Sequence, residues 1–221
     1  MTFGKIGARR MMWSINNLLP KGARWVEYLE NSGAEYYNSA WIDTGVVPNF
    51  NTSLKIEVIP KANYGWIFGS RNDAANPVVD RFCLFYDQFG NIYYQFDALT
   101  QNAVFRIQEN IKYNINLSVN GLTINDRFFT LGATPSQFQG VYPISLFNIR
   151  ASQSAPTNNP FSGKITMCDI YDAQSPIRKF RPIAIGTTGY MMDILTGDYL
   201  QYGNHGTGSF IIGPDAQPPT I

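Results

Sequence analysis

The segment Gly163–Asp172, with the sequence GKITMCDIYD, restricts the possible folds of this chain more than any other part. Side chains of an extended chain alternate between two faces. Met167 would then lie on one face, and Cys168 and Ile170 on the other. A strand with apolar side chains on both faces is expected in the middle of a packed β-structure and not at its edge. We therefore predict a central strand at these residues.

Alternation of apolar and polar residues continues along most of the chain after residue 24. Roughly fourteen such segments follow one another, separated by Gly, Pro, Asn and Asp residues that favour turns. Asn120 and Gly121 predict a tight hairpin. Pro176 and Pro182 exclude a helix and predict a strand near a sheet margin, and residues 189–213 predict a meander of short strands. We expect an all-β fold in which two antiparallel sheets pack as a sandwich.

The chain length of 221 residues fits one all-β sandwich. Residues 1–24 differ from the rest, because they contain five of the 17 basic residues and no acidic residue. We predict a docking arm over 1–24, a jelly-roll domain over 25–215 and a proline-rich tail over 216–221. A leader without fixed structure is the alternative for the arm, since chain termini are often mobile. The residues predicted to make the arm's contacts are Arg9, Arg10, Met11, Met12 and Trp13.

Two segments carry a resemblance to a known family. The first runs from Gly163 to Pro214 and ends in GNHGTGSFIIGP, and the second is WVEYLENSGAEYYNSAWIDTGVVPNFNTSLKIEV at Trp25–Val58. In the second segment, Asn38 to Ala40 lengthen the usual stretch before Trp41. Together they resemble the two ends of a laminin-G-like, concanavalin A-like jelly-roll domain, a type found in virion proteins of tailed bacteriophages and in surface proteins of gut bacteria. The resemblance implies the jelly-roll fold and covers roughly residues 25–215.

Composition excludes several classes of function. Lys and Arg number 17 against 16 Asp and Glu, so no net charge attracts nucleic acid. No stretch approaches the ~20 apolar residues that span a bilayer, and the apolar run after Arg10 is interrupted by polar residues, so we expect no membrane segment and no secretion signal. Cys83 and Cys168 lack the spacing of a zinc site and are predicted to be buried, reduced thiols.

The sequence predicts no catalytic residue, metal site or cofactor. Glycoside hydrolysis needs two carboxyl groups close together, but Asp169 and Asp172 are three residues apart and would point to opposite faces. His205 lies in a Gly-rich turn, and no GxSxG motif accompanies it. Calcium would require clustered oxygen ligands. The loop acids are too dispersed to support such a site, at Asp73, Asp80, Asp87, Asp97 and Asp126.

Aromatic residues make up 14% of the chain, so rings must fill the core, stack on a ligand or lie under another subunit. Trp41 and Tyr94 are the candidate sugar-binding residues. From the resemblance and the basic arm we predict a non-enzymatic structural protein on the virion surface of a tailed phage, made in the host cytoplasm. It would contact other capsid or tail proteins through the arm and form a homo-oligomer or a multicopy array. The alternative is a carbohydrate-binding adhesin of a phage tail or a bacterial surface, with host or mucosal glycans as its ligands.

Overall fold

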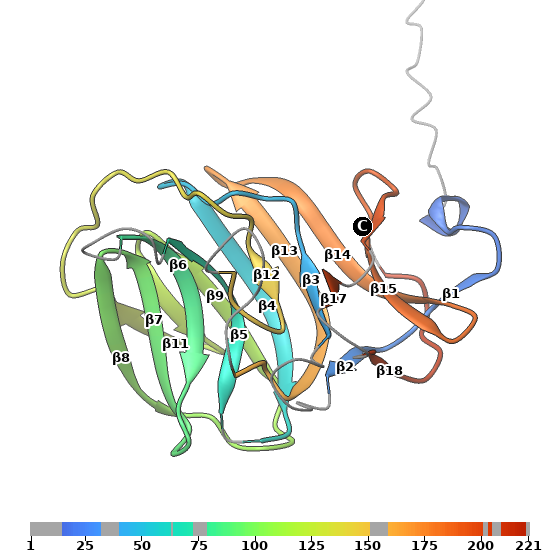
Figure 1. Ribbon diagram of the computed structural model, residues 1–221, viewed down its shortest axis with the longest axis horizontal. Coiled ribbons are helices and arrows are strands. Elements are labelled where there is room, and N and C mark those ends of the chain that lie inside the picture. Colours follow the sequence, from blue (N-terminus) through green and yellow to red (C-terminus); the bar gives the residue numbers. More distant parts are fainter. Residues whose placement is uncertain are drawn as a thin grey trace, which may run out of the picture.

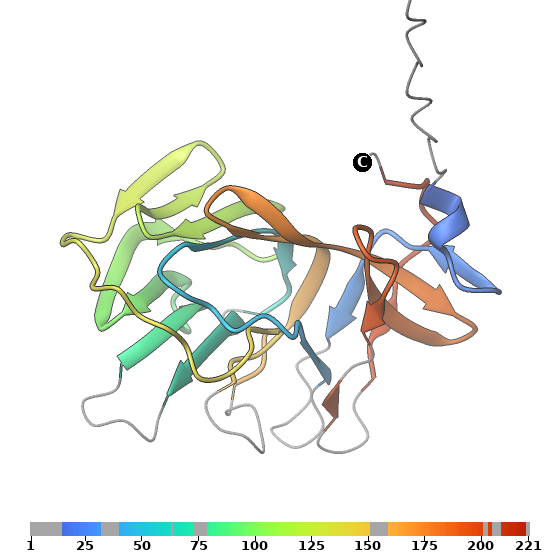
Figure 2. The same ribbon diagram turned by 90° about the horizontal axis from the view of Figure 1, so that it is seen from above.

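The computed structural model describes residues 15–31, 40–62, 64–72, 79–150, 159–200, 203–204 and 209–219. These residues form two antiparallel β-sheets that are packed as two layers (Figures 1 and 2). The inner faces of the sheets share one hydrophobic core. The core joins Leu54 and Ile56 of one sheet to Phe82 and Leu84 of the other, all of them buried. The predicted all-β jelly-roll sandwich is therefore confirmed.

The larger sheet has eleven strands, and eight of them form one continuous path. In spatial order these are β11 (Arg127–Thr130), β10 (Gly121–Ile124), β9 (Tyr113–Ser118), β4 (Thr52–Pro60), β13 (Gly163–Asp172), β14 (Ser175–Ile185), β15 (Thr188–Asp193) and β16 (Tyr199–Leu200). The other three are short and pair beside this path: β1 (Ala23–Trp25), β2 (Leu29–Asn31) and β18 (Ile211–Ile212).

The smaller sheet has seven strands. Their spatial order is β17 (Gly203–Asn204), β3 (Ala40–Asp43), β12 (Ser145–Leu146), β5 (Gly65–Asn72), β6 (Val79–Tyr86), β7 (Asn91–Asp97) and β8 (Leu99–Arg106). Strand β8 is thus one edge of the smaller sheet, and β11 is one edge of the larger sheet. The ring centroids of Phe105 on β8 and Phe129 on β11 are 6.2 Å apart.

Strand β13 is central, as predicted, because it pairs with β4 on one side and with β14 on the other. Its pattern differs from strict alternation in one respect. The pairing with β4 shifts between Ile165 and Met167, which indicates a β-bulge. A bulge adds one residue and exchanges the two faces, so Ile165 joins Cys168 and Ile170 in the core while Met167 stays half-buried.

Strand β14 corrects the expectation that its prolines place it near a sheet margin. It pairs with β15 along one side, and on the other with β13 at its start and β1 at its end. Pro182 lies between the parts that pair with β13 and with β1, so its missing N–H falls where the partner changes, and its carbonyl accepts a hydrogen bond from the N–H of Val26 at 3.2 Å. Proline is tolerated inside this sheet because the ladder on the side of β13 and β1 is interrupted at Pro182, although the ladder with β15 continues past it.

The C-terminal region is not the simple meander that was expected. Strands β15 and β16 form a hairpin in the larger sheet, but β17 pairs with β3 in the smaller sheet and β18 pairs with β2 in the larger one. The chain therefore crosses between the two layers twice. Pairs of only two residues depend on the surrounding fold for stability, and alternation cannot assign them to a sheet.

Part of the predicted arm packs against the domain. The 3₁₀-helix η1 (Ile15–Leu18) precedes β1, and Figure 1 shows both beside β14 and β15. Ile15 and Trp25 are buried in a small cluster with Ile183, and the N–H of Ala216 donates to the carbonyl of Trp25 at 3.0 Å. The expected boundary at residues 24–25 thus falls inside β1. The predicted contact residues of the arm lie outside the described residues.

Two further findings concern the cysteines and membrane segments. Cys83 and Cys168 are both buried and unbridged, as predicted. Burial, with a smaller contribution from the charge of Asp169, raises the pKa of the Cys168 thiol well above its usual value. Across the part of the chain that the structure describes, no helix has the length and apolarity needed to cross a membrane.

Candidate functional site

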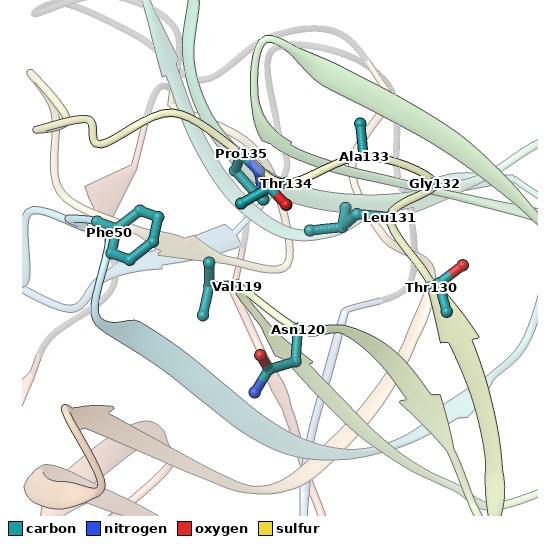
Figure 3. Close-up of a pocket in the computed structure, with 9 residues that line it drawn as sticks. All are labelled: Phe50, Val119, Asn120, Thr130, Leu131, Gly132, Ala133, Thr134 and Pro135. Atoms are coloured by element: carbon teal, nitrogen blue, oxygen red, sulfur yellow. The ribbon is translucent and has the colours of Figure 1, made fainter.

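A surface groove lies beside the β9–β10 turn (Figure 3). Its volume is about 620 Å³. Three separate segments line it: the loop before β4, the β9–β10 turn and the chain that leaves β11. The lining residues are Phe50, Val119, Asn120, Thr130, Leu131, Gly132, Ala133, Thr134 and Pro135. Figure 3 shows Phe50, Val119, Leu131 and Pro135 around its centre, with Asn120 and Thr130 toward its margin.

Backbone geometry fixes the β9–β10 turn at the groove. The predicted hairpin is confirmed, but Val119 and Asn120 form the loop, while Gly121 already pairs with Ser118. Gly121 has a φ of +135°, and a Cβ atom there would lie 2.2 Å from the carbonyl oxygen of Phe129. Only glycine allows β11 to approach so closely. The turn therefore lies directly beside the end of β11.

Two interactions hold the remaining walls of the groove. The hydroxyl of Tyr94 donates a hydrogen bond to the carbonyl of Thr130, and Leu131 is buried with 2% of its surface exposed. On the opposite wall, the N–H of Phe50 donates to the carbonyl of Phe138 at 3.1 Å. These contacts connect the groove to the core, so its shape is set by the fold.

The groove lining is electrically neutral. None of its nine side chains is ionisable, and most are apolar. Asn120, Thr130 and Thr134 are exposed, and their side chains have no hydrogen-bond partner within the described residues. An uncharged ligand with apolar and hydrogen-bonding parts would match this lining, whereas an ion would be left without a partner.

A second feature lies on the outer face of the smaller sheet. Trp66, Phe85 and Tyr93 occupy directly paired positions on β5, β6 and β7. The ring centroids of Trp66 and Phe85 are 4.4 Å apart, and those of Phe85 and Tyr93 are 4.8 Å apart with an angle of 12° between the ring planes. We call these three rings the aromatic stack. Phe85 and Tyr93 lie face to face, whereas the ring of Trp66 is tilted by 43° to that of Phe85. The ring faces that a ligand could contact are those at the two ends, turned away from Phe85.

The two ends of the aromatic stack differ. At one end, the guanidinium of Arg71 lies 5.3 Å from the centre of the Trp66 ring, a cation–π arrangement. At the other end, Tyr93 stands beside β8, and its cross-strand partner is the exposed Asn102. Within the described part of the chain, Phe85 is the only ring that contacts Tyr93. No ring of the described residues covers the face of Tyr93 toward β8, which lies next to a small polar side chain.

A carboxylate and an amide border the Tyr93 end. Asp87 accepts a hydrogen bond from the side chain of Asn91 at 2.9 Å and from the Tyr93 hydroxyl at 3.3 Å. Partial burial acts to raise the pKa of Asp87, but four hydrogen bonds to the carboxylate outweigh it and lower the pKa below its usual value. The donors are the side chain and N–H of Asn91, the N–H of Phe89 and the hydroxyl of Tyr93. Partial desolvation and the charge of Asp87 raise the pKa of Tyr93. At neutral pH Asp87 is ionised and Tyr93 is an uncharged donor.

The structure buries both predicted sugar-binding residues. Tyr94 is 1% exposed and Trp41 is 8% exposed, so neither offers an open ring face. Trp41 lies beneath the guanidinium of Arg150, 5.9 Å from its ring centre, and Tyr94 supports the groove through Thr130. The alternation in Asn91–Asp97 indicates that Tyr93 faces outward. Ile92, Tyr94 and Phe96 are the apolar residues that point inward, and Tyr93 lies between two of them in the sequence.

The residues considered for catalysis do not gather into a site. Asp169 is 6% exposed, and Arg181 pairs with it through contacts of 2.5 and 3.4 Å. His205 lies outside the described residues. Among the residues that the structure describes, no three His, Cys, Asp or Glu side chains are grouped so that they could hold a metal ion.

Comparison with known proteins supports the fold class. No protein-family model matches the chain, and no curated protein matches its sequence. A candidate carbohydrate-binding protein from Bacteroides ovatus aligns with a TM-score of 0.51 and 11% identity, over 90% of this chain and 62% of its own length. This chain thus spans less than two thirds of that protein. The similarity supports the fold of this chain as a two-sheet β-sandwich.

Two further solved structures align less closely. An SAP-like pentraxin from Limulus polyphemus gives a TM-score of 0.48 and 14% identity, over 66% of this chain and 76% of the pentraxin. A mutant sialidase from Trypanosoma rangeli gives 0.38 and 12%, over 54% of this chain and 20% of the sialidase.

Proposed function

We propose that this protein binds carbohydrate without catalysis, through the Tyr93 end of the aromatic stack. One observation carries the proposal: a ring with one face that no described ring covers stands beside an ionised carboxylate and two amide side chains, Asp87, Asn91 and Asn102. Sugars present both a C–H surface that stacks on aromatic rings and hydroxyl groups that need hydrogen-bond partners. The Tyr93 end offers both kinds of contact.

The rigidity of Tyr93 favours binding. Phe85 supports one face of its ring, and Asp87 accepts a hydrogen bond from its hydroxyl. A side chain that is already fixed loses little conformational entropy when a ligand arrives. The carboxylate of Asp87 already accepts four hydrogen bonds, from the N–H groups of Phe89 and Asn91, the Asn91 side chain and the Tyr93 hydroxyl. These bonds fill its acceptor sites, so Asp87 holds the site in place and leaves the amide groups of Asn91 and Asn102 to bind sugar hydroxyls.

The name of the Bacteroides ovatus protein is compatible with this proposal, because it shows that a fold of this class has been associated with carbohydrate. The chemistry of the Tyr93 end supports the assignment in this chain.

The proposal is tested by screening the protein on a glycan array and measuring the best ligand by calorimetry. Tyr93→Ala is expected to weaken binding at least tenfold, or about 1.4 kcal/mol, because it removes the stacking surface. Tyr93→Phe should retain most of the affinity. The control is Tyr199→Ala, which removes an exposed ring from the larger sheet. Unchanged affinity in Tyr93→Ala, or the absence of any glycan ligand, would contradict the proposal.

Display of this domain on a tailed-phage virion, in a homo-oligomer or multicopy array, stays a prediction from the sequence resemblance. The basic and apolar composition of residues 1–14 supports attachment through that segment. Because Ile15 and Trp25 belong to a buried cluster, the test should remove residues 1–14 and leave 15–24 in place. The truncated protein is expected to keep its thermal stability and to be lost from purified particles. Normal incorporation into particles would contradict an attaching role for residues 1–14.

A further inference from the structure

We propose that the groove is a second carbohydrate subsite, selective for an acetamido sugar such as an N-acetylhexosamine. This inference rests on the proposed function, since it gives the same class of ligand, carbohydrate, a second binding surface on the protein. The groove is lined by segments around β9, β10 and β11, whereas the aromatic stack lies on β5, β6 and β7. The two sites can therefore be altered independently.

The lining of the groove carries no charge. None of the nine lining residues is ionisable, so a charged ligand would lose part of its hydration without gaining an ion pair, and a neutral ligand is favoured. A sugar with a protonated amine, or with a carboxylate, would find no counter-charge in the lining. Acetylation of the amine removes the charge and leaves a neutral amide.

The centre of the groove is apolar. Phe50, Val119, Leu131 and Pro135 surround the centre of the groove (Figure 3). An unmodified hexose carries hydroxyls on most of its ring carbons and would place several of them against carbon, where they lose hydrogen bonds to water. The methyl of an acetamido group is an apolar group that this centre can cover.

Three polar side chains of the lining can form hydrogen bonds with a ligand. The carboxamide of Asn120 contains a donor and an acceptor, which match the C=O and N–H of an acetamido group. The hydroxyls of Thr130 and Thr134 can each donate and accept, and neither has a hydrogen-bond partner among the described residues. The volume of about 620 Å³ is in the range typical of small-molecule sites, roughly 300–1,000 Å³, so a disaccharide would fit.

Three β-1,4-linked disaccharides with the same skeleton test the inference: N,N′-diacetylchitobiose, the glucosamine disaccharide and cellobiose. Calorimetry should show diacetylchitobiose binding at least tenfold more tightly than the other two. Asn120→Ala should reduce this preference several-fold, because it removes the amide contacts. Ala133→Trp should block the groove, and since Ala133 is exposed, the fold should tolerate the change. Gln137→Trp is the control, because Gln137 is exposed in the same loop and does not line the groove.

The outcomes separate this inference from the proposed function. Equal affinity for diacetylchitobiose and cellobiose, or binding that Ala133→Trp leaves unchanged, would overturn the groove assignment. If Tyr93→Ala still weakened glycan binding in that case, the proposed function would stand. Loss of acetyl-selective binding in Ala133→Trp but not in Gln137→Trp or Tyr93→Ala would establish the groove as a separate subsite. No binding of any saccharide would overturn both.

Discussion

The outer faces of the two sheets use different interactions, although their inner faces share one core. On the larger sheet, Arg181 pairs with Asp169, and Lys112 pairs with Glu57 at 2.9 Å. On the smaller sheet, the corresponding face carries the aromatic stack. Opposite charges satisfy one another and leave little for a ligand to gain. A stack of rings always has terminal faces, and no ring of the described residues covers the outer face of Tyr93. The difference favours the smaller sheet as the place of the ring-stacking site.

The largest effect is expected from breaking the ion pair of the larger sheet. Arg181→Met leaves the carboxylate of Asp169, which is 6% exposed, without its bidentate partner. The free energy of unfolding should fall by about 3 kcal/mol, because an uncompensated buried charge is costly. Urea unfolding monitored by circular dichroism measures this change.

An exposed ion pair supplies the control. Arg24 and Asp215 are 2.7 Å apart, but their side chains are 43% and 75% exposed. Arg24→Met should cost less than about 1 kcal/mol, because water and salt screen the pair. Similar losses of unfolding free energy in Arg181→Met and Arg24→Met would show that Arg181 and Asp169 do not behave as a buried ion pair.

Removing the middle ring should have an intermediate effect on the smaller sheet. Phe85 contacts both Trp66 and Tyr93 and is half-buried. Phe85→Ala should lower the free energy of unfolding by about 2 kcal/mol, less than a fully buried ring would. It should also weaken glycan binding, since Tyr93 loses its support.

A double-mutant cycle tests the coupling of the two rings. Phe85→Ala and Tyr93→Ala should show a coupling free energy of about 0.5–1.5 kcal/mol, typical of an aromatic pair. The corresponding cycle for Phe85 and Tyr199, which lie on different sheets, should give a value near zero. Strict additivity for Phe85 and Tyr93 would contradict the stack as a cooperative unit.

The smallest effect concerns pH. The pKa of Asp87 is lower in the folded protein than in the unfolded chain, so its contribution to stability is present above the unfolded value, about 4, and is lost as pH falls through the folded value. Asp87→Asn should therefore reduce stability near pH 7 by less than about 1 kcal/mol, given its surface position. The difference from the wild-type protein should shrink as pH falls below about 4 and disappear once Asp87 is protonated in the folded and the unfolded state. A difference that persists after this protonation would point to lost packing and not to ionisation.

The sequence predicts the architecture because its main features are local. Alternation identifies β13 and the strands of the core, and the Asn120–Gly121 pair identifies the β9–β10 hairpin to within one residue. It does not predict the placement of β17 and β18, which have two residues each. It also does not predict the bulge in β13, because the extra residue is defined only by pairing with β4.

The candidate site was harder to predict. Tyr93 and Tyr94 are neighbours in the sequence and point to opposite sides of β7. The inward set of this strand indicates which tyrosine faces out, but only pairing with β6 shows that Phe85 covers one face of Tyr93. The groove depends on the contact of Phe50 with two neighbouring segments, 119–120 and 130–135, that are far from it in the sequence, and local patterns do not encode this contact.

Titration of the protein with its array-selected glycan, followed by NMR of selectively labelled tyrosine rings, tests the central claim most directly. The account predicts that the ring signals of Tyr93 shift and saturate with the calorimetric affinity, while those of Tyr199 and of Tyr171 on the larger sheet remain unchanged. Shifts confined to the tyrosines of the larger sheet, with no response at Tyr93, would contradict it.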